Sequence, residues 1–273
     1  MADNTDNTAQ DGWDLIIAPW HLDERIPAFP VPAGGAELAC PPVPAGSELD
    51  RMTLRNRAVA DAVARARRPL LLSGDCTVGL GAVAGLQRRH SQVAVVWLDA
   101  HGDFNTPTIT ITGYLAGMSL AMLTGRVPEL TCDLLGLRPV ADSDVVLVDA
   151  RDLDPAEREA LTASQLRRVP ADPAAISAAV AGLGQRPVYL HVDVDVIDGP
   201  QLPGLRFPVD GGPAIPRVED CLAAIVTAAN VTAAGIACAW LPEHINDKAT
   251  REAIARLARR LGARFAWPEA SAV

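Results

Sequence analysis

Two apolar runs that are rich in β-branched residues each lead directly into a group of aspartates. Residues 93–98 precede Asp99, and residues 188–192 precede Asp193. Such a run is typical of a buried strand. Carboxylates gathered at the ends of such strands repel one another unless a cation neutralises them. The two runs therefore predict buried strands with a metal site at their carboxyl ends.

Strand and helix patterns alternate along the rest of the chain. The other expected strands cover residues 14–18, 69–74, 145–148 and 235–240. The expected helices cover residues 49–67, 77–89, 116–124, 174–183, 218–229 and 250–261, with one more after Asp154. This alternation predicts an α/β fold with three layers, α/β/α, around a central, mostly parallel sheet of about eight strands. In such sheets ligands bind beyond the carboxyl ends of the strands, where both aspartate groups fall.

The length and the distribution of polar residues suggest how the chain is divided. A chain of 273 residues suits one large α/β domain better than two independent ones. Residues 1–12 are polar and are expected to form a disordered tail, which leaves residues 13–273 as a single domain. The stretch 26–47 is rich in Pro and Gly and is expected to be a long surface loop.

Charge and cysteine content limit the partners and the compartment. A formal net charge of −9 argues against nucleic acid and against anionic membranes as partners. No run of 18 apolar residues predicts a membrane-spanning helix, and the polar N-terminus lacks the pattern of a signal peptide. The five cysteines show no regular spacing, which fits reduced thiols. A cytoplasmic protein with a small-molecule partner is therefore expected.

The donor atoms of the two aspartate groups indicate which metal they hold. Asp99, His101 and Asp103 alternate along the first segment, and Asp193 and Asp195 do so along the second. Four carboxylates and one imidazole favour Mn²⁺ over Mg²⁺ or Fe²⁺, and over a zinc–thiolate site. A single aspartate at the end of a strand is more often a turn former or a helix cap, but five ligands in two matched clusters favour a metal site. Two metals that share carboxylates would activate one water between them.

Three segments carry a resemblance to a known family. Residues 99–107 resemble the DAHxDxNTP signature of the arginase (ureohydrolase) family, and residues 191–198 resemble its SxDxDxxDP signature. Residues 72–77 resemble its GGDHS segment. The resemblance spans about residues 70–260 and implies an arginase-like metallohydrolase domain. It implies an amidinohydrolase that holds two Mn²⁺ per chain and hydrolyses a guanidino C–N bond.

The resemblance also assigns roles to the metal-binding residues. It implies that Asp99 and Asp193 bridge the two metals. His101 and Asp195 would complete one metal's ligand set, and Asp103 would bind the other metal and take part in catalysis.

Further residues are implied for the substrate. Asn105 and Thr112 occupy positions that hold the α-carboxylate of an amino acid, and Asp154, in a segment that resembles RDxDPxE, would bind the α-amino group. Asp154 could equally be the N-cap of a helix. Together these residues favour a guanidino amino acid over agmatine, which lacks the carboxylate.

Two departures from the family pattern bear on chemistry. The histidine of GGDHS is Cys76 here, which could ligate the metal as a softer ligand and weaken one site, or could be a buried inert thiol. The family's second histidine, which is usually assigned to proton transfer, falls on Ala116. A proton shuttle contributes roughly 10²–10⁴-fold to rate, so its loss is expected to impair hydrolysis of arginine.

A third departure concerns the guanidinium end of the substrate. The family's guanidinium-binding glutamate aligns with Trp240, and Glu243, three residues later, either substitutes for it as a catalytic residue or is a surface residue. His191 and His244 receive no role from the resemblance, although strict alternation puts His191 on the same face as Asp193 and Asp195.

These departures fit a guanidine that is less basic than arginine's. They are similar to the branch of the family that hydrolyses Nω-hydroxy-L-arginine to hydroxyurea and L-ornithine in antibiotic biosynthesis of the D-cycloserine type. Two alternatives stay open: an ordinary arginase or other guanidino-acid hydrolase, and a catalytically inactive binding protein with the arginase fold. No segment of the sequence announces an oligomer interface.

Overall fold

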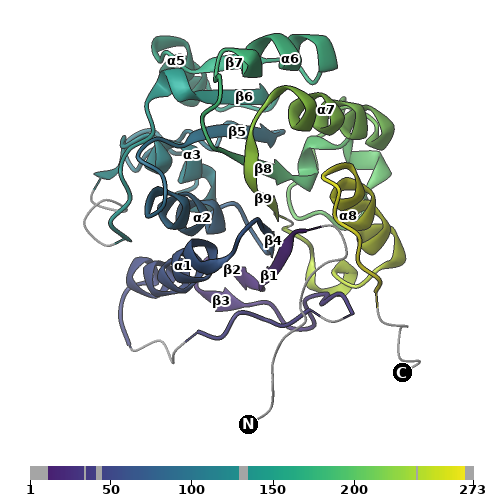
Figure 1. Ribbon diagram of the computed structural model, residues 1–273. Coiled ribbons are helices and arrows are strands. Elements are labelled where there is room, and N and C mark those ends of the chain that lie inside the picture. Colours follow the sequence, from purple (N-terminus) through teal and green to yellow (C-terminus); the bar gives the residue numbers. More distant parts are fainter. Residues whose placement is uncertain (1–11, 34, 41–44, 129–134, 238, 268–273) are drawn as a thin grey trace.

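The computed structural model describes residues 12–33, 35–40, 45–128, 135–237 and 239–267 (Figure 1). The strands of its main sheet are β1 (Asp14–Ala18), β4 (Pro69–Ser73), β5 (Ala94–Asp99), β6 (Val145–Asp149), β7 (Arg167–Val169), β8 (Val188–Asp193) and β9 (Val231–Ala237). The helices are α1 (Glu48–Arg65), α2 (Val78–Gln87), α3 (Ser119–Leu123), α5 (Pro155–Ala163), α6 (Pro173–Ala181), α7 (Ile215–Ala228) and α8 (Lys248–Arg260). A small separate hairpin pairs β2 (Trp20–His21) with β3 (Glu24–Arg25).

The seven strands of the sheet lie in the order β1-β4-β9-β8-β5-β6-β7, and every neighbouring pair is parallel. Their carboxyl ends therefore meet at one edge. Trp97 of β5 is the register partner of His191 of β8. Asp99 and Asp193, each two residues further along, consequently lie side by side at that edge and on the same face of the sheet.

Helices cover both faces of the sheet. Helices α1, α2 and α3 lie on one side, and α6, α7 and α8 lie on the other (Figure 1). Two buried clusters fill the spaces between the layers: one joins the sheet to α6, α7 and α8, and the other joins it to the helices of the opposite side. The expected three-layer α/β/α fold with a parallel sheet is thus confirmed, with seven strands in the described part of the chain where about eight were expected.

The sequence-based expectations differ from the structure at the weakest strand signals. Strand β9 spans Val231–Ala237, whereas residues 235–240 were expected, because its small residues give no clear apolar run. Strand β7 was not expected, since this exposed edge strand begins with two arginines. Of the tail expected at residues 1–12, residues 1–11 lie outside the described residues. Among the described residues, no helix has both the length and the apolar character needed to cross a membrane.

Helix α2 packs closely on α1 because it carries glycine at the contact. A Cβ atom on Gly81 would lie 2.5 Å from the carbonyl oxygen of Asn56 and 2.8 Å from the Cβ of Val59. The Gly81 amide also donates a 2.9 Å hydrogen bond to the side-chain oxygen of Asn56. The buried side-chain oxygen of Asn56 therefore has a hydrogen-bond partner because glycine at position 81 lets the backbone of α2 approach α1 closely.

Gly81→Ala is expected to lower the free energy of unfolding by about 1–3 kcal/mol, because overpacking against a backbone carbonyl outweighs the gain in helix propensity. Gly117→Ala is the matched control, since a Cβ there meets nothing within 4 Å. Urea unfolding of both variants measures the difference. Equal stability of the two variants would contradict this account of the α1–α2 contact.

Candidate metal centre

The residues implied as metal ligands gather where β5 and β8 end. Asp99 is the last residue of β5, and Asp193 is the last residue of β8. They border a cavity of about 390 Å³. All six residues expected to bind metal line this cavity: Cys76, Asp99, His101, Asp103, Asp193 and Asp195.

Asp99 is held at the centre of this group by backbone and side-chain donors. Its Oδ1 accepts a 2.7 Å hydrogen bond from the His101 amide, and its Oδ2 accepts a 3.3 Å bond from the Trp97 indole. Its side chain belongs to both clusters of potential metal-binding atoms in the described residues, one with Cys76 and one with His101. Asp99 is therefore placed where a carboxylate shared by two ions would have to lie.

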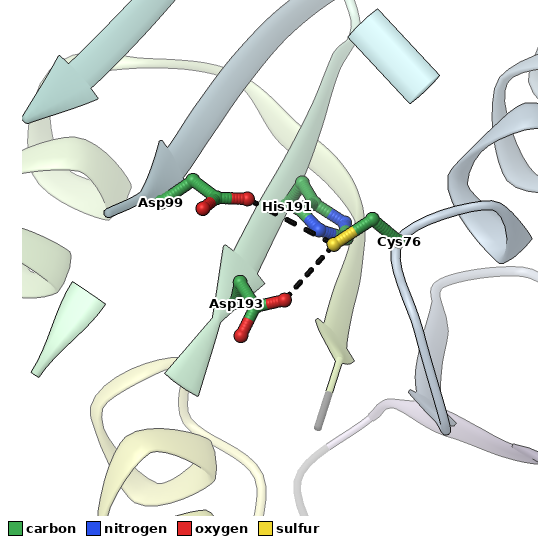
Figure 2. A group of neighbouring side chains, drawn as sticks. All are labelled: Cys76, Asp99, His191 and Asp193. Carbon is green, nitrogen blue, oxygen red and sulfur yellow. Dashed lines mark hydrogen bonds between the residues drawn. The ribbon is translucent and has the colours of Figure 1, made fainter. Parts of the chain in front are cut away.

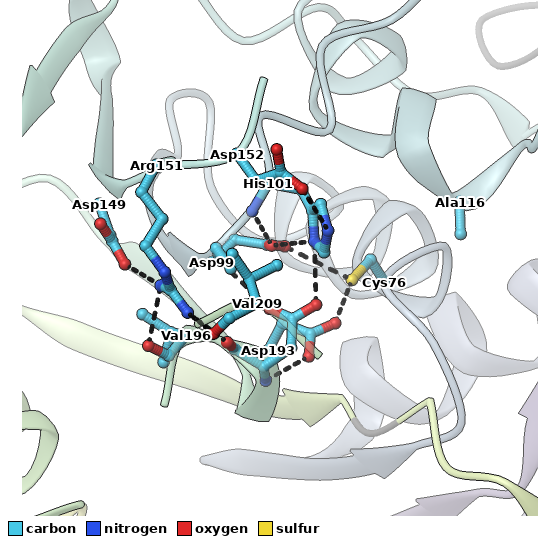
Figure 3. A network of polar contacts seen from close by, with 12 residues as sticks. Cys76, Asp99, His101, Ala116, Asp149, Arg151, Asp152, Asp193, Val196 and Val209 are labelled. Atoms are coloured by element: carbon cyan, nitrogen blue, oxygen red, sulfur yellow. Dashed lines mark hydrogen bonds and ion pairs between the residues drawn. The ribbon is translucent and has the colours of Figure 1, made fainter. Parts of the chain in front are cut away.

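His101 lies on one side of the site (Figure 3), and Asp195 pairs with it. The His101 Nδ1 lies 3.0 Å from Asp195 Oδ2 and 3.4 Å from Asp99 Oδ1. The other oxygen of Asp195 accepts a 3.1 Å hydrogen bond from the Ala100 amide. Burial lowers the pKa of His101, but its hydrogen bonds to Asp195 and Asp99 outweigh burial and raise the pKa to about 12. A divalent ion would displace the proton that this imidazole holds among carboxylates.

Asp103 points a free oxygen into the cavity. Its backbone adopts a left-handed conformation (φ +50°), and its Oδ2 is buried without a hydrogen-bond partner. The turn that carries it is locked by Glu157, which accepts a 2.8 Å hydrogen bond from the Phe104 amide. A Cβ on Gly102 would lie 2.6 Å from Glu157 Oε1, so glycine is needed there. A buried carboxylate oxygen with no donor is costly in the absence of a cation.

The electrostatics of the cluster point the same way. Burial, together with the charge of Asp195, raises the pKa of Asp193 to about 8. Burial and the charge of Asp99 raise the pKa of Asp195 to about 6. Burial and neighbouring carboxylates also raise the pKa of Asp103 well above its ordinary value. Each of these buried carboxyl groups thus makes ionisation of its neighbours less favourable. A bound divalent cation would reverse this effect, because it stabilises the charged form of each group.

Cys76 and His191 form the other side of the site (Figure 2). The Cys76 thiol donates to Asp193 Oδ2 at 2.9 Å and lies 3.8 Å from Asp99 Oδ2. Burial and the charge of Asp193 raise the pKa of this thiol well above its ordinary value. Cys76, Asp99, His191 and Asp193 each offer one donor atom, and these atoms lie within 4.8 Å of one another. This donor set, mostly oxygen and imidazole, fits a hard divalent ion.

Arg151 supports the loops that carry the aspartates (Figure 3). Its guanidinium pairs with Asp149 and donates to the carbonyl oxygens of Asp195 at 3.2 Å, Val196 at 3.1 Å and Val209 at 2.8 Å. The turn after β6 is therefore tied to the turn after β8 by one planar group with several donors.

The residues expected to bind substrate also line the cavity. Asn105 donates from Nδ2 to Asp154 Oδ2 at 3.4 Å, and its own Oδ1 is buried without a partner. Thr112 borders the same space. Asp154 occupies the N-cap position of α5, yet its side chain makes no capping hydrogen bond. Its carboxylate is therefore not used by the helix and faces Asn105.

The structure does not bring Glu243 to this cavity. Glu243 is exposed on a short 3-10 helix, Pro242–His244, and is not among the residues that line the site. Trp240 is buried and does not line the cavity either, whereas Ala239 does. Both residues follow β9, whose end the sequence put three residues too late. Ala116, by contrast, lines the cavity as its alignment implied, and no acidic or basic side chain replaces it at that position.

An aromatic wall at this cavity was not singled out from the sequence. The Tyr114 hydroxyl lies 3.3 Å from His21 Nε2, and its ring packs against Phe207 with the centroids 5.2 Å apart. Tyr114 and Phe207 both line the site. They come from two loops rich in Thr, Gly or Pro and lie far apart in the chain. The only signal in the sequence was that Tyr114 stands two residues after Thr112.

Comparisons with known proteins agree with this geometry. The model of the family described as the arginase family matches residues 33–263. The chain is 35% identical over 142 residues to an Nω-hydroxy-L-arginine amidinohydrolase of Streptomyces lavendulae, which covers 52% of this chain and 50% of that protein. It is 33% identical over 175 residues to Arginase-1 of Sus scrofa, covering 58% and 54%. The matches span about half the length of these curated relatives.

The fold also resembles solved structures. The arginase of Bacillus cereus superposes with a TM-score of 0.72 at 26% identity, covering 78% of each chain. The structural likeness therefore extends beyond the 142 and 175 residues that align with the two curated relatives.

Replacement of Arg151 tests whether the support of the loops governs metal binding. Arg151→Lys keeps the charge but loses most of the carbonyl contacts, so affinity for Mn²⁺ is expected to fall about 10–100-fold, as for other outer partners of metal ligands. Arg217→Lys is the matched control, because Arg217 pairs only with exposed groups near Asp172. Titration with Mn²⁺ measures both affinities, and equal values would contradict the supporting role.

Proposed function

The chain belongs to the arginase family, and on that premise we propose that it is a manganese-dependent amidinohydrolase that acts on a guanidino amino acid. The preferred substrate is Nω-hydroxy-L-arginine, and the products are hydroxyurea and L-ornithine. The proposal includes two Mn²⁺ per chain, and a role in antibiotic biosynthesis of the D-cycloserine type. When bound, the metal pair supplies Lewis acidity and an activated water.

The side chains at the metal end have separate parts in this proposal. Asp99 and Asp193 would each bind both ions, and His101 and Asp195 would complete the ligand set on one side. Asp103 accepts a proton of the attacking water at its Oδ2, which is supported by the absence of any other partner for that atom. Water adds to the guanidino carbon, the bond to the ornithine nitrogen breaks, and that nitrogen takes up the proton.

The side chains at the other end of the cavity hold the amino acid. Asp154 accepts from the α-ammonium group, and Asn105 and Thr112 bind the α-carboxylate. The Asp154 carboxylate supports this role because its helix does not use it as a cap. The 3.4 Å contact between Asn105 and Asp154 sets these two groups beside each other, as the substituents of one α-carbon require.

The observation that carries the choice of substrate is Ala116 in the cavity wall. A methyl group there cannot pass a proton to the leaving amine. An N-hydroxyguanidine is less basic than the alkylguanidine of arginine, so it needs less help from an acid and less charge recognition. The exposed position of Glu243 agrees with this, because it leaves the guanidino end without a carboxylate from that segment.

L-Arginine is the second candidate, because Arginase-1 of Sus scrofa is nearly as similar to this chain as the Streptomyces lavendulae relative. An inactive binding protein is the third. The buried carboxylate cluster argues against an inactive protein, because buried acids that repel one another lower the stability of the fold unless they bind a metal ion.

The first test compares the two substrates with the Mn²⁺-loaded protein. Turnover of Nω-hydroxy-L-arginine is expected to exceed that of L-arginine in kcat/KM by about 100-fold or more, the scale of a missing proton shuttle. Assays of ornithine with hydroxyurea or urea measure both reactions. Equal or better turnover of arginine would overturn the proposal. No turnover of either, with no rise in melting temperature on adding Mn²⁺, would favour the inactive protein.

A second test restores an acid to the cavity. Ala116→His is expected to raise kcat/KM for L-arginine relative to Nω-hydroxy-L-arginine by about tenfold or more, because it supplies a proton to the leaving amine. Ala116→Gln is the control, since it has similar bulk without a group that titrates near neutral pH. An equal change in both variants would mean that only the shape of the cavity matters.

A further inference from the structure

His191 of β8 is a buried histidine with one nitrogen left over. The side chain is 1% exposed, and its Nε2 has no hydrogen-bond partner. The other nitrogen, Nδ1, lies 3.3 Å from the Tyr189 hydroxyl. The ring stacks on Trp97 with the centroids 3.6 Å apart and the planes 18° from parallel. Two neighbours therefore fix the position of the imidazole without using its last donor or acceptor.

The surroundings of the ring are those of a metal ligand. A nitrogen of His191 lies within 4.8 Å of the Cys76 sulfur and of an oxygen from each of Asp99 and Asp193. Figure 2 shows the imidazole beside the sulfur, with a dashed line from the sulfur to one carboxylate oxygen of Asp99 and another to one of Asp193. Donors on opposite sides of one ion stand roughly 4.0–4.6 Å apart when each bond is about 2.0–2.3 Å. Small side-chain adjustments would let one ion touch all four groups.

Two residues of this cluster differ from the family signatures. The GGDHS segment has histidine where this chain has Cys76, and the SxDxDxxDP signature has serine where it has His191. The exchange keeps one neutral nitrogen donor on this side of the cluster. Mn²⁺ prefers imidazole and carboxylate to sulfur, so the site gains more from His191 than from the cysteine.

We propose that His191 Nε2 is a ligand of the metal on the Cys76 side, together with Asp99 and Asp193, and takes the place of the histidine missing at position 76. Tyr189 orients the ring by accepting a hydrogen bond from Nδ1–H, which leaves the Nε2 lone pair for the ion. Gly235 makes room for that hydroxyl, since a Cβ there would lie 2.4 Å from it. The inference rests on the metal centre of the proposed function and not on the choice of substrate.

Metal content tests the proposal directly. After dialysis against limiting free Mn²⁺, the wild-type chain is expected to hold two ions and His191→Ser one, because the side with His101 and Asp195 is intact. The double variant Cys76→His with His191→Ser is expected to recover the second ion, because it returns the imidazole to position 76. Tyr189→Phe keeps the ligand but not its orientation, so the second site is expected to weaken by about 10-fold or more.

Two ions retained by His191→Ser with unchanged affinity would overturn the proposal and make His191 a packing residue. A measurement on the wild-type protein does not depend on whether the variants fold. In crystals grown with Mn²⁺, anomalous scattering should place an ion about 2.0–2.3 Å from His191 Nε2. An ion bound by Cys76, Asp99 and Asp193 but remote from that nitrogen would refute the assignment. Loss of the second ion in His191→Ser, with no turnover of either guanidine by the Mn²⁺-loaded wild-type protein, would instead refute only the proposed function.

Discussion

Mutual repulsion among buried carboxylates is the constraint on which the rest of the structure depends. Asp99, Asp103, Asp193 and Asp195 are each at most 6% exposed, and each lies near others of the same charge. Within the described residues, His101 forms ion pairs with Asp99 and Asp195, and one imidazolium cannot offset four negative charges. Such a group is stable only if protons or cations neutralise it. A parallel sheet can hold it because the strands fix the backbone independently of the charges at their ends.

Polar side chains around the cluster hold the loops that carry the aspartates in place. Arg151 binds carbonyl oxygens from two turns, and Glu157 holds the turn that carries Asp103. Neither needs to contact a metal to matter, since a ligand displaced by a fraction of an ångström loses much of its affinity. The left-handed backbone at Asp103 belongs to the same design: an uncommon conformation is kept where it directs a side chain into the site.

Sequence patterns predicted the parts of this molecule that depend on local apolar runs and on motif spacing. The strands that carry Asp99 and Asp193 are such runs, and the parallel register then sets the two aspartates side by side. The wall formed by Tyr114 and Phe207 was not predictable, because it depends on how two loops meet. The sequence left open whether Glu243 is catalytic or a surface residue, because β9 consists of small residues and its end could not be located from hydrophobicity.

The departures from the family pattern fall into two physically different kinds. At the metal side, the histidine missing at Cys76 is matched by an imidazole at His191, which reaches the same cluster from β8, a strand separated from β4 by β9. At the substrate side, Ala116 stands where the family pattern has histidine, and among the described residues that line the cavity the one histidine is His101, which belongs to the metal cluster. A substitution that is compensated preserves a function, whereas one that is not changes what the site can do. The residues proposed to bind metal are therefore the part of this site that keeps the family pattern in compensated form, and the part that would meet the guanidine departs from it. A change of substrate explains this difference between the two sides better than a loss of catalytic activity does. A protein that had lost its activity would not need to keep the buried residues expected to bind metal.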